Sequence, residues 1–100
     1  MQVLFSWDEA NRSHIAEHGV SPEEAEQLVL NDPVDLEVQI RSGEERTLQV
    51  GETNSGRVLV VVTTWRVGRI RVITAFPANK KLRAFYESYR EQEGEGAENS

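Results

Sequence analysis

Four short runs of apolar and β-branched residues, separated by turn residues, constrain the fold of this chain most strongly. Val34–Ile40 and Arg46–Val50 alternate apolar and polar residues with the period of a half-buried strand. Val58–Thr64 is almost wholly apolar or β-branched, which predicts a central strand, and Arg69–Phe76 completes the set. The turns between the runs are short, and short turns join only antiparallel strands. The pattern therefore predicts a four-stranded antiparallel sheet.

Two helices are expected before this sheet, each with residues that can cap its first turn. Ser6-Trp7-Asp8-Glu9 has the spacing of a capping box, with Asp8 as the alternative N-cap. This helix is expected to run to about His18, because Gly19 supplies a residue that ends helices. Ser21-Pro22-Glu23-Glu24 repeats the box, with proline at the first helical position of a helix that ends before Asn31. Ahead of both helices, residues 2–5 are expected to form a short strand or an extended segment.

A third helix is expected after Pro77, where the strand pattern breaks and Asn79 can act as the N-cap. Its apolar residues recur with helical spacing and predict a stripe that packs on the sheet: Leu82, Phe85, Tyr86 and Tyr89. From Glu91 onward the chain is almost entirely polar, which predicts a disordered acidic tail. We therefore expect an α+β fold in one domain over residues 1–90, followed by a tail over residues 91–100.

Charge is distributed unevenly along the chain. The net charge is −6, yet residues 57–90 carry eight basic side chains against Glu87 as their single acid. Such asymmetry points to a polyanion or an oppositely charged partner, unless folding interleaves the two halves and removes the patch. Cysteine is absent, which excludes disulfides and thiolate chemistry. We expect a cytoplasmic protein without membrane contact, because neither a signal-peptide pattern nor a bilayer-spanning apolar run is present.

The stretch His14-Ile15-Ala16-Glu17-His18 fits the H-x-x-E-H pattern of some zinc proteases. A zinc site needs a third ligand, but the chain has no other histidine and no cysteine. His18 is expected to interact with the C-terminal end of its helix, and His14 to pack at the rim of the apolar face. Proton transfer by one of them is the alternative. The sequence predicts no metal site.

Several stretches, taken in their order along the chain, resemble the BrnT-type toxins. In the helical part they are Trp7-Asp8-Glu9, Glu17-His18-Gly19-Val20 and Asn31-Asp32-Pro33. In the sheet and last helix they are Gly43-Glu44-Glu45-Arg46, Val60–Arg66, Arg69–Ala75 and Tyr86. The resemblance covers about residues 3–90. It implies a RelE-like fold and the toxin of a type II toxin–antitoxin system, an endoribonuclease that cuts RNA without a metal or other cofactor.

The same resemblance implies a ribbon-helix-helix antitoxin as partner, with DNA reached only through that antitoxin. Three residues depart from the family pattern. Phe76 stands where arginine is usual, Leu82 where glutamate is usual, and Glu17 where lysine is frequent. Phe76 and Leu82 favour the alternative of a non-catalytic relative that binds an antitoxin and takes part in operon repression, whereas the retained arginines favour a ribonuclease.

Metal-free RNA cleavage needs a base, an acid and cations that stabilise the charge on the phosphate. Arginine suits the last role because its fork matches two phosphate oxygens and stays charged. The residues expected to carry the reaction are Glu45, Arg46, Arg66, Arg71 and Tyr86, with His14 and His18 as further proton-transfer candidates. The residues expected to bind RNA are Arg69, Lys80, Lys81 and Trp65.

Each of these residue types also has a plainer explanation. The arginines could form ion pairs across the sheet with Glu37, Glu44 or Glu45. Tyr86 could pack in the core with its hydroxyl at the edge, and Trp65 could be partly buried at a strand end. The lysines could form a solvated helix start. Only the tertiary structure can separate these alternatives.

Overall fold

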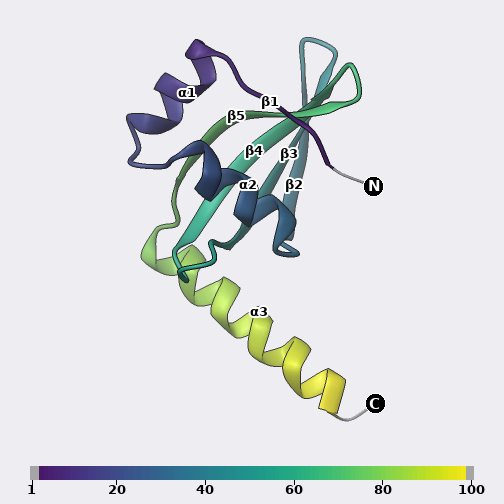
Figure 1. The fold of residues 1–100 in the computed structure, drawn as a ribbon. Coiled ribbons are helices and arrows are strands. Elements are labelled where there is room, and N and C mark those ends of the chain that lie inside the picture. The colour runs from purple at the N-terminus through teal and green to yellow at the C-terminus, as the bar shows by residue number, and fades with distance from the viewer. Residues whose placement is uncertain (1–2, 99–100) are drawn as a thin grey trace.

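The apolar run that starts at Val58 forms β4 (Val58–Arg66), the middle strand of a sheet with order β1-β5-β4-β3-β2 (Figure 1). The computed structural model that shows this sheet describes residues 3–98. β4 pairs antiparallel with β3 (Glu44–Glu52) and β5 (Arg69–Pro77), and β3 pairs antiparallel with β2 (Val34–Arg41). The α+β class and the central position of β4 are thus confirmed.

The sheet has five strands and is mixed, so the prediction of a four-stranded antiparallel sheet was incomplete. β1 (Phe5–Ser6) pairs in parallel with β5, with Phe5 opposite Ile70 and Ser6 opposite Arg71. Two residues are too few to show a strand period, and their partners lie at the far end of the chain. Local sequence patterns therefore carry no signal for this pairing.

Helices α1 (Glu9–Ala16) and α2 (Pro22–Leu30) lie on the same side of the sheet (Figure 1). The N-cap of α1 is Asp8, the alternative of the two candidates, and the helix ends two residues before His18. The Ser21 box of α2 forms as predicted. Apolar residues of both helices bury against β4 and β5 in one core: Ile15, Val20, Ala25, Leu28, Leu59, Val61, Val72 and Ala75.

The third helix, α3 (Lys80–Glu98), projects away from the sheet rather than lying along it (Figure 1). The Asn79 side chain caps it as predicted, with Oδ1 accepting from the Leu82 amide at 2.8 Å. Of the predicted stripe, Leu82 and Tyr86 pack against the sheet, whereas Phe85 is 47% exposed and Tyr89 is also exposed. The stripe prediction therefore holds only for the start of the helix.

The predicted disordered tail begins at Glu91, but α3 continues through it to Glu98. Residues 99–100 lie outside the described part of the chain. Low apolar content shows that a segment has no core to bury, yet glutamate and glutamine are good helix formers. Arg90 also pairs with Glu93 one turn later, at 2.8 Å. The end of α3 combines these two properties: its sequence is too polar to form a core, yet it continues a helix that is anchored at its start.

A β-bulge in β5 decides which residues share the second face of the sheet. Val62 pairs with Thr74, but the next residue, Thr63, pairs with Val72, so Ile73 is an extra residue. Strict alternation would place Arg71 and Phe76 on opposite faces, because one number is odd and the other even. The bulge instead lets both point away from the core under α1 and α2. A second apolar cluster forms there: Val50, Val60, Ala78 and Tyr86, with Val34, Val58, Phe76 and Leu82 packed against it.

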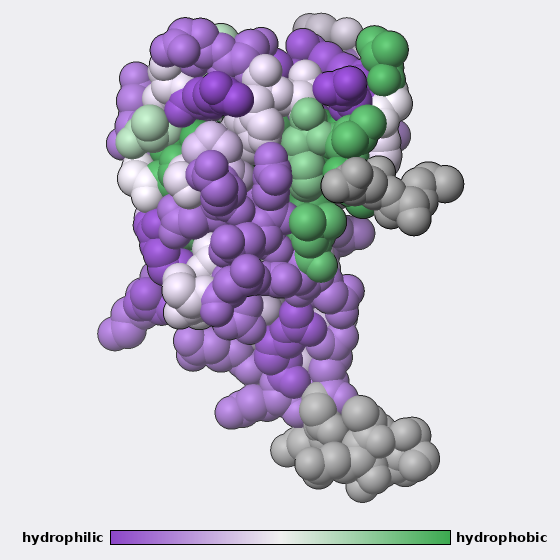
Figure 2. All heavy atoms as spheres, viewed as in Figure 1, coloured by the Kyte–Doolittle hydropathy of each residue, from purple (hydrophilic) through white to green (hydrophobic). Residues whose placement is uncertain are grey.

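The surface differs between the body of the molecule and its third helix. In the view of Figure 2, apolar side chains gather beside the N-terminal segment, whereas the coloured part of α3 that faces the viewer is hydrophilic. The exposed large apolar residues include Leu36, Val38 and Ile40, which follow one another along the edge strand β2. A membrane-spanning helix is not found among the described residues.

Candidate functional site

A hollow of about 370 Å³ gathers three arginines from three neighbouring strands. Arg46 comes from β3, Arg66 from β4 and Arg71 from β5. We call it the arginine hollow and define it by its lining residues: Ala10, Asn11, His14, Arg46, Arg66, Arg71 and Ile73. The sequence predicted these three arginines among the residues that carry the reaction, and the structure brings them together, without Arg69, the fourth candidate arginine of the strands.

Two carboxylates hold the three guanidinium groups in place. Glu44 accepts from Arg46 Nε at 3.2 Å and from Arg66 Nε and Nη2 at 3.2 and 3.0 Å. Asp8 accepts from Arg71 Nη1 and Nη2 at 2.9 and 3.2 Å. Hydrogen bonds from Arg66 and then Arg46 lower the pKa of Glu44, and hydrogen bonds from Arg71 and then from the Asn11 amide lower the pKa of Asp8. Three cations and two anions leave the hollow with a net positive charge.

Helix α1 forms one wall of the hollow because Asn11 ties it to the edge of the sheet. The Asn11 side-chain amide is 3% exposed and donates to the Val72 carbonyl at 3.1 Å and to the Ser6 carbonyl at 3.0 Å. β1 ends at Ser6, opposite Arg71, so β1 does not extend to pair with the next residue of β5. Asn11 instead provides the hydrogen-bond donor for the Val72 carbonyl. This anchor places His14, three residues later on the same helix face, at the hollow.

The two histidines lie in a row with Phe76. The His14 and His18 rings pack edge to face, with 5.4 Å between their centroids. The His18 and Phe76 rings also pack edge to face, with 6.1 Å between their centroids. Glu17 Oε2 lies 4.0 Å from His14 Nδ1, close enough for charge attraction but too far for a hydrogen bond. Within the described chain, no group of three histidine, aspartate or glutamate side chains is arranged to hold a metal ion.

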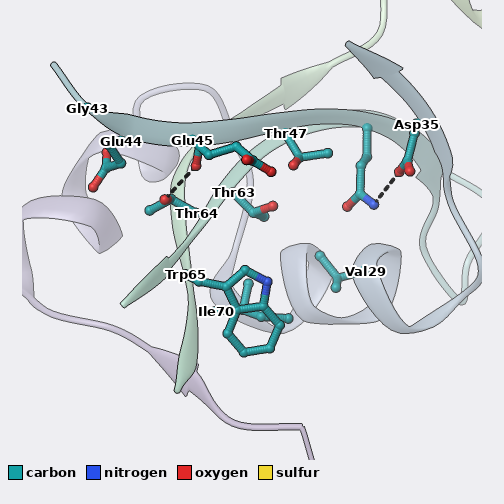
Figure 3. Close-up of a pocket in the computed structure, with 11 residues that line it drawn as sticks. Val29, Asp35, Gly43, Glu44, Glu45, Thr47, Thr63, Thr64, Trp65 and Ile70 are labelled. Atoms are coloured by element: carbon teal, nitrogen blue, oxygen red, sulfur yellow. Dashed lines mark hydrogen bonds between the residues drawn. The ribbon is translucent and has the colours of Figure 1, made fainter. Parts of the chain in front are cut away.

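Glu45 and Trp65, two of the predicted site residues, lie apart from the arginine hollow. Both line a larger hollow of about 750 Å³ with Thr47, Thr63 and Ile70 (Figure 3). Glu44 also lines this larger hollow, but its carboxylate accepts from Arg46 and Arg66, a contact not found for the Glu45 carboxylate among the described residues. The Glu45 carbonyl accepts from Thr64 Oγ1 at 2.7 Å, which ties β3 to β4 here.

Tyr86 also lies outside the arginine hollow, buried in the second apolar cluster. Its side chain is 2% exposed, and its hydroxyl accepts from Arg90 Nε at 2.9 Å and lies 3.3 Å from Glu52 Oε1. Burial raises the pKa of this hydroxyl. Arg90 extends the network to the carbonyls of Asn31 and Asp32. This arrangement matches core packing, the plainer of the two explanations.

The remaining predicted RNA-binding residues are exposed and stand at two ends of the sheet. Arg69 pairs in register with Arg66 beside the β4–β5 turn, so both share a face, but Arg69 does not line the hollow. Lys80 and Lys81 begin α3 beyond the other end of β5. Neither lysine lines the hollow.

Sequence reasoning missed three residues that build the arginine hollow: Asp8, Asn11 and Glu44. Asp8 was considered only as a helix cap, and Glu44 only as one of several partners for the arginines. Asn11 gave no local signal, because its two acceptors are backbone carbonyls of other segments. The period of β3 was available to separate Glu44 from Glu45, since residues on the face of Arg46 must have even numbers in that strand.

Comparison with known proteins agrees with the resemblance seen in the sequence. A search of curated proteins found no match. A family model described as the ribonuclease toxin BrnT of type II toxin–antitoxin systems matches residues 7–81. This span includes α1, α2 and strands β2 to β5, and with them every residue that lines the arginine hollow. The chain belongs to the BrnT family of ribonuclease toxins of type II toxin–antitoxin systems.

Proposed function

We propose that this toxin cleaves RNA without a metal ion and binds the scissile phosphate in the arginine hollow. The observation that carries the proposal is the meeting of Arg46, Arg66 and Arg71 in one hollow. Negative charge builds up on the phosphate oxygens as cleavage proceeds, and fixed guanidinium groups stabilise that charge without reorganising. Arginine also keeps its proton at any physiological pH, so the cluster needs no metal to remain cationic.

The carboxylates in the hollow position the arginines and still leave donors for a phosphate. A guanidinium has five N–H donors, and Arg71 directs Nη1 and Nη2 to Asp8. Its Nε and its outward hydrogens remain for an anion. Arg46 donates to Glu44 through Nε, and among the described residues its two terminal nitrogens make no hydrogen bond. The net positive charge supports binding of an anion over a cation.

The partner in this proposal is a ribbon-helix-helix antitoxin, and DNA is bound only through that antitoxin in the cytoplasm. Membership of a type II family supports an antitoxin partner. The edge strand β2 offers a surface for one, because Val38 and Ile40 are exposed and the outer side of the strand has no partner strand in the sheet. A partner strand or helix would bury these side chains.

A second candidate function is antitoxin binding without RNA cleavage. It is favoured by Phe76, which packs in the second apolar cluster and against His18 and thus adds no cation to the hollow. Leu82 belongs to the same cluster and adds no carboxylate. The two candidates differ in one measurable property, cleavage of RNA by the purified chain.

The test is RNA binding and cleavage in the presence of EDTA by the full chain and three variants. Arg66→Ala and Arg71→Ala are expected to weaken RNA binding and to reduce the slope of log K against log salt by about one per lost contact. Arg83→Ala is the matched control, because it removes an exposed arginine from α3, outside the hollow. It should leave both quantities unchanged.

Two results would contradict the proposal. If chelation abolishes cleavage and added metal restores it, the chemistry is not metal-free. If Arg66→Ala and Arg71→Ala bind RNA as the unmodified chain does but no longer bind the antitoxin, the hollow is a protein interface. The second candidate function would then replace the first.

A further inference from the structure

RNA cleavage by the neighbouring 2′-hydroxyl needs a group that takes up a proton, and the arginine hollow contains one side chain suited to this. Arginine does not lose its proton under physiological conditions. Ala10, Asn11 and Ile73, which complete the lining with the arginines and His14, do not titrate near neutral pH. His14 is the exception, because an imidazole nitrogen can accept a proton.

The other proton-transfer candidates are excluded from this role by their positions. Glu45 lines the larger hollow together with Trp65 and Thr47. The Tyr86 hydroxyl is engaged by Arg90 and Glu52 in a buried cluster. The carboxylates that do reach the hollow hold the arginines, and their lowered pKa values make them poor bases.

The position of His14 suits a base that works through Nε2. Asn11 anchors α1 to the sheet edge one turn earlier, so the backbone that carries His14 is held rigidly. The imidazole is 49% exposed, which leaves it accessible to a bound RNA. Glu17 Oε2 lies 4.0 Å from Nδ1, so Nε2 is the ring nitrogen that this carboxylate does not approach.

We propose that His14 Nε2 is the general base of the reaction, an inference that rests on the proposed ribonuclease function. The 2′-oxygen forms a bond to phosphorus while the bond from phosphorus to the 5′-oxygen breaks. The proton of the 2′-hydroxyl passes to His14, and the 5′-oxygen takes a proton from water. The resulting hydroxide removes the proton from the imidazolium, which restores the base. The products are a 2′,3′-cyclic phosphate and a 5′-hydroxyl end.

The charged and titratable groups around His14 come from four elements. On α1 these groups are Glu17 and the neighbouring ring of His18. The strands contribute the three arginines of the hollow, Arg71 from β5, Arg66 from β4 and Arg46 from β3. Asp8 is bound to Arg71, and Glu44 is bound to Arg46 and Arg66. Carboxylates as a class are already ionised above about pH 5, and arginines keep their proton throughout the physiological range. Between about pH 5.5 and 8.5, His14 and His18 are therefore the two side chains to which a pH dependence of cleavage must be assigned. One variant of each histidine distinguishes between them.

The experiment measures single-turnover cleavage of an RNA oligonucleotide by the full chain in EDTA across that pH range. For the unmodified chain the rate should rise about tenfold per pH unit on the acidic side and then level off. His14→Gln should lower the plateau by about 100-fold or more and abolish the rise. Its affinity for an oligonucleotide with a 2′-deoxy residue at the cleavage position should stay within about twofold, since the arginines that bind phosphate remain.

His18→Gln is the matched control, because it removes the same contact between the two rings but does not line the hollow. It should keep the plateau and the rise. Thermal unfolding of both variants, followed by circular dichroism, compares their stability. Added imidazole should restore part of the rate to His14→Ala, because a soluble base then occupies the vacated space.

Three outcomes would overturn the inference, and they can be told apart. If His14→Gln cleaves with the rate and pH dependence of the unmodified chain, His14 is not the base and the ribonuclease function stands. If His14→Gln and His18→Gln lose rate and stability equally, the ring pair is structural. If the unmodified chain binds RNA but cleaves none at any pH, the proposed function and this inference both fail.

Discussion

Glu44 shows how a single carboxylate organises two cations from different strands. Its two oxygens accept from Arg46 within β3 and from Arg66 across to β4. Ion pairs of this kind at the surface contribute little to stability. The main effect of this arrangement is therefore to fix the positions of the two guanidinium groups. It keeps two guanidinium groups directed at the same space, where a phosphate can meet both.

Glu44→Gln is expected to tighten RNA binding severalfold at low salt, because it removes one of the two negative charges from the hollow while an oxygen remains to accept from the arginines. The unfolding free energy should change little, because ion pairs at the surface contribute little to stability. Fluorescence anisotropy with a labelled oligonucleotide over a salt series measures the binding. Glu45→Gln makes the same charge change on the opposite face and should have little effect. Equal effects of both variants would mean that overall charge, and not the hollow, governs binding.

At the scale of elements, α2 is joined to the sheet by Glu24. This residue completes the capping box by accepting from the Ser21 amide at 3.1 Å, and it also accepts from Arg57 Nη1 at 2.7 Å. Arg57 precedes β4 and donates in addition to the Gly19 carbonyl. One side chain thus links the start of α2 to the start of the central strand, while Leu28 of the same helix packs closely against Gly51 of β3.

The Glu24 link should make stability depend on pH. The hydrogen bond from Arg57 lowers the pKa of Glu24 below its ordinary value of 4.5. A lowered folded-state pKa stabilises the fold above the unfolded-state value, and this contribution is lost as pH falls through the folded-state value. Glu24→Gln keeps an acceptor for the cap but loses the charge. It should cost about 1 kcal/mol or less at pH 7, and less than that at pH 3, because the contribution declines below pH 4.5.

Urea unfolding of the unmodified chain and of Glu24→Gln at both pH values measures this difference. Glu23→Gln is the control, because Glu23 lies in the same first turn but is exposed and makes none of these contacts. A loss at pH 3 as large as that at pH 7 would show that the carboxylate charge is not the source of the effect.

At the scale of the whole molecule, the projecting α3 dominates the shape. The molecule measures 44 × 27 × 26 Å, long in one direction because α3 leaves the sheet (Figure 1). The arginine hollow opens on the side of the sheet away from the main core. The chain remains acidic overall, with a net charge of −6, so an RNA approaches a local positive site on a molecule that repels it at longer range.

Deletion of residues 94–100 tests this long-range repulsion, because it removes Glu95 and Glu98 and changes the net charge from −6 to −4. RNA binding should tighten modestly at low salt, and the difference should vanish at high salt, where charges are screened. The unfolding free energy should stay the same if the domain ends near residue 90. The full-length variant with Glu95→Gln and Glu98→Gln separates charge from length. A lower unfolding free energy of the deletion variant would contradict the predicted domain boundary.

The sequence by itself determined the order and kind of the main elements. Strand period, turn residues, helix caps and the apolar run from Val58 are local signals, and each of them was expressed in the structure. These features follow from interactions between residues close together in the chain, where steric and hydrogen-bonding preferences act without help from the rest of the fold. The sequence also singled out Arg46, Arg66 and Arg71, but it did not show that they would share a face.

Only the tertiary structure decided which residues complete the site. The pairing of β1 with β5, the bulge at Ile73 and the anchoring of α1 by Asn11 all join segments far apart in the sequence. They set Asp8 and His14 beside the arginines and leave Tyr86 in the core. Such contacts depend on the summed packing of the whole chain, and a local pattern carries no information about them.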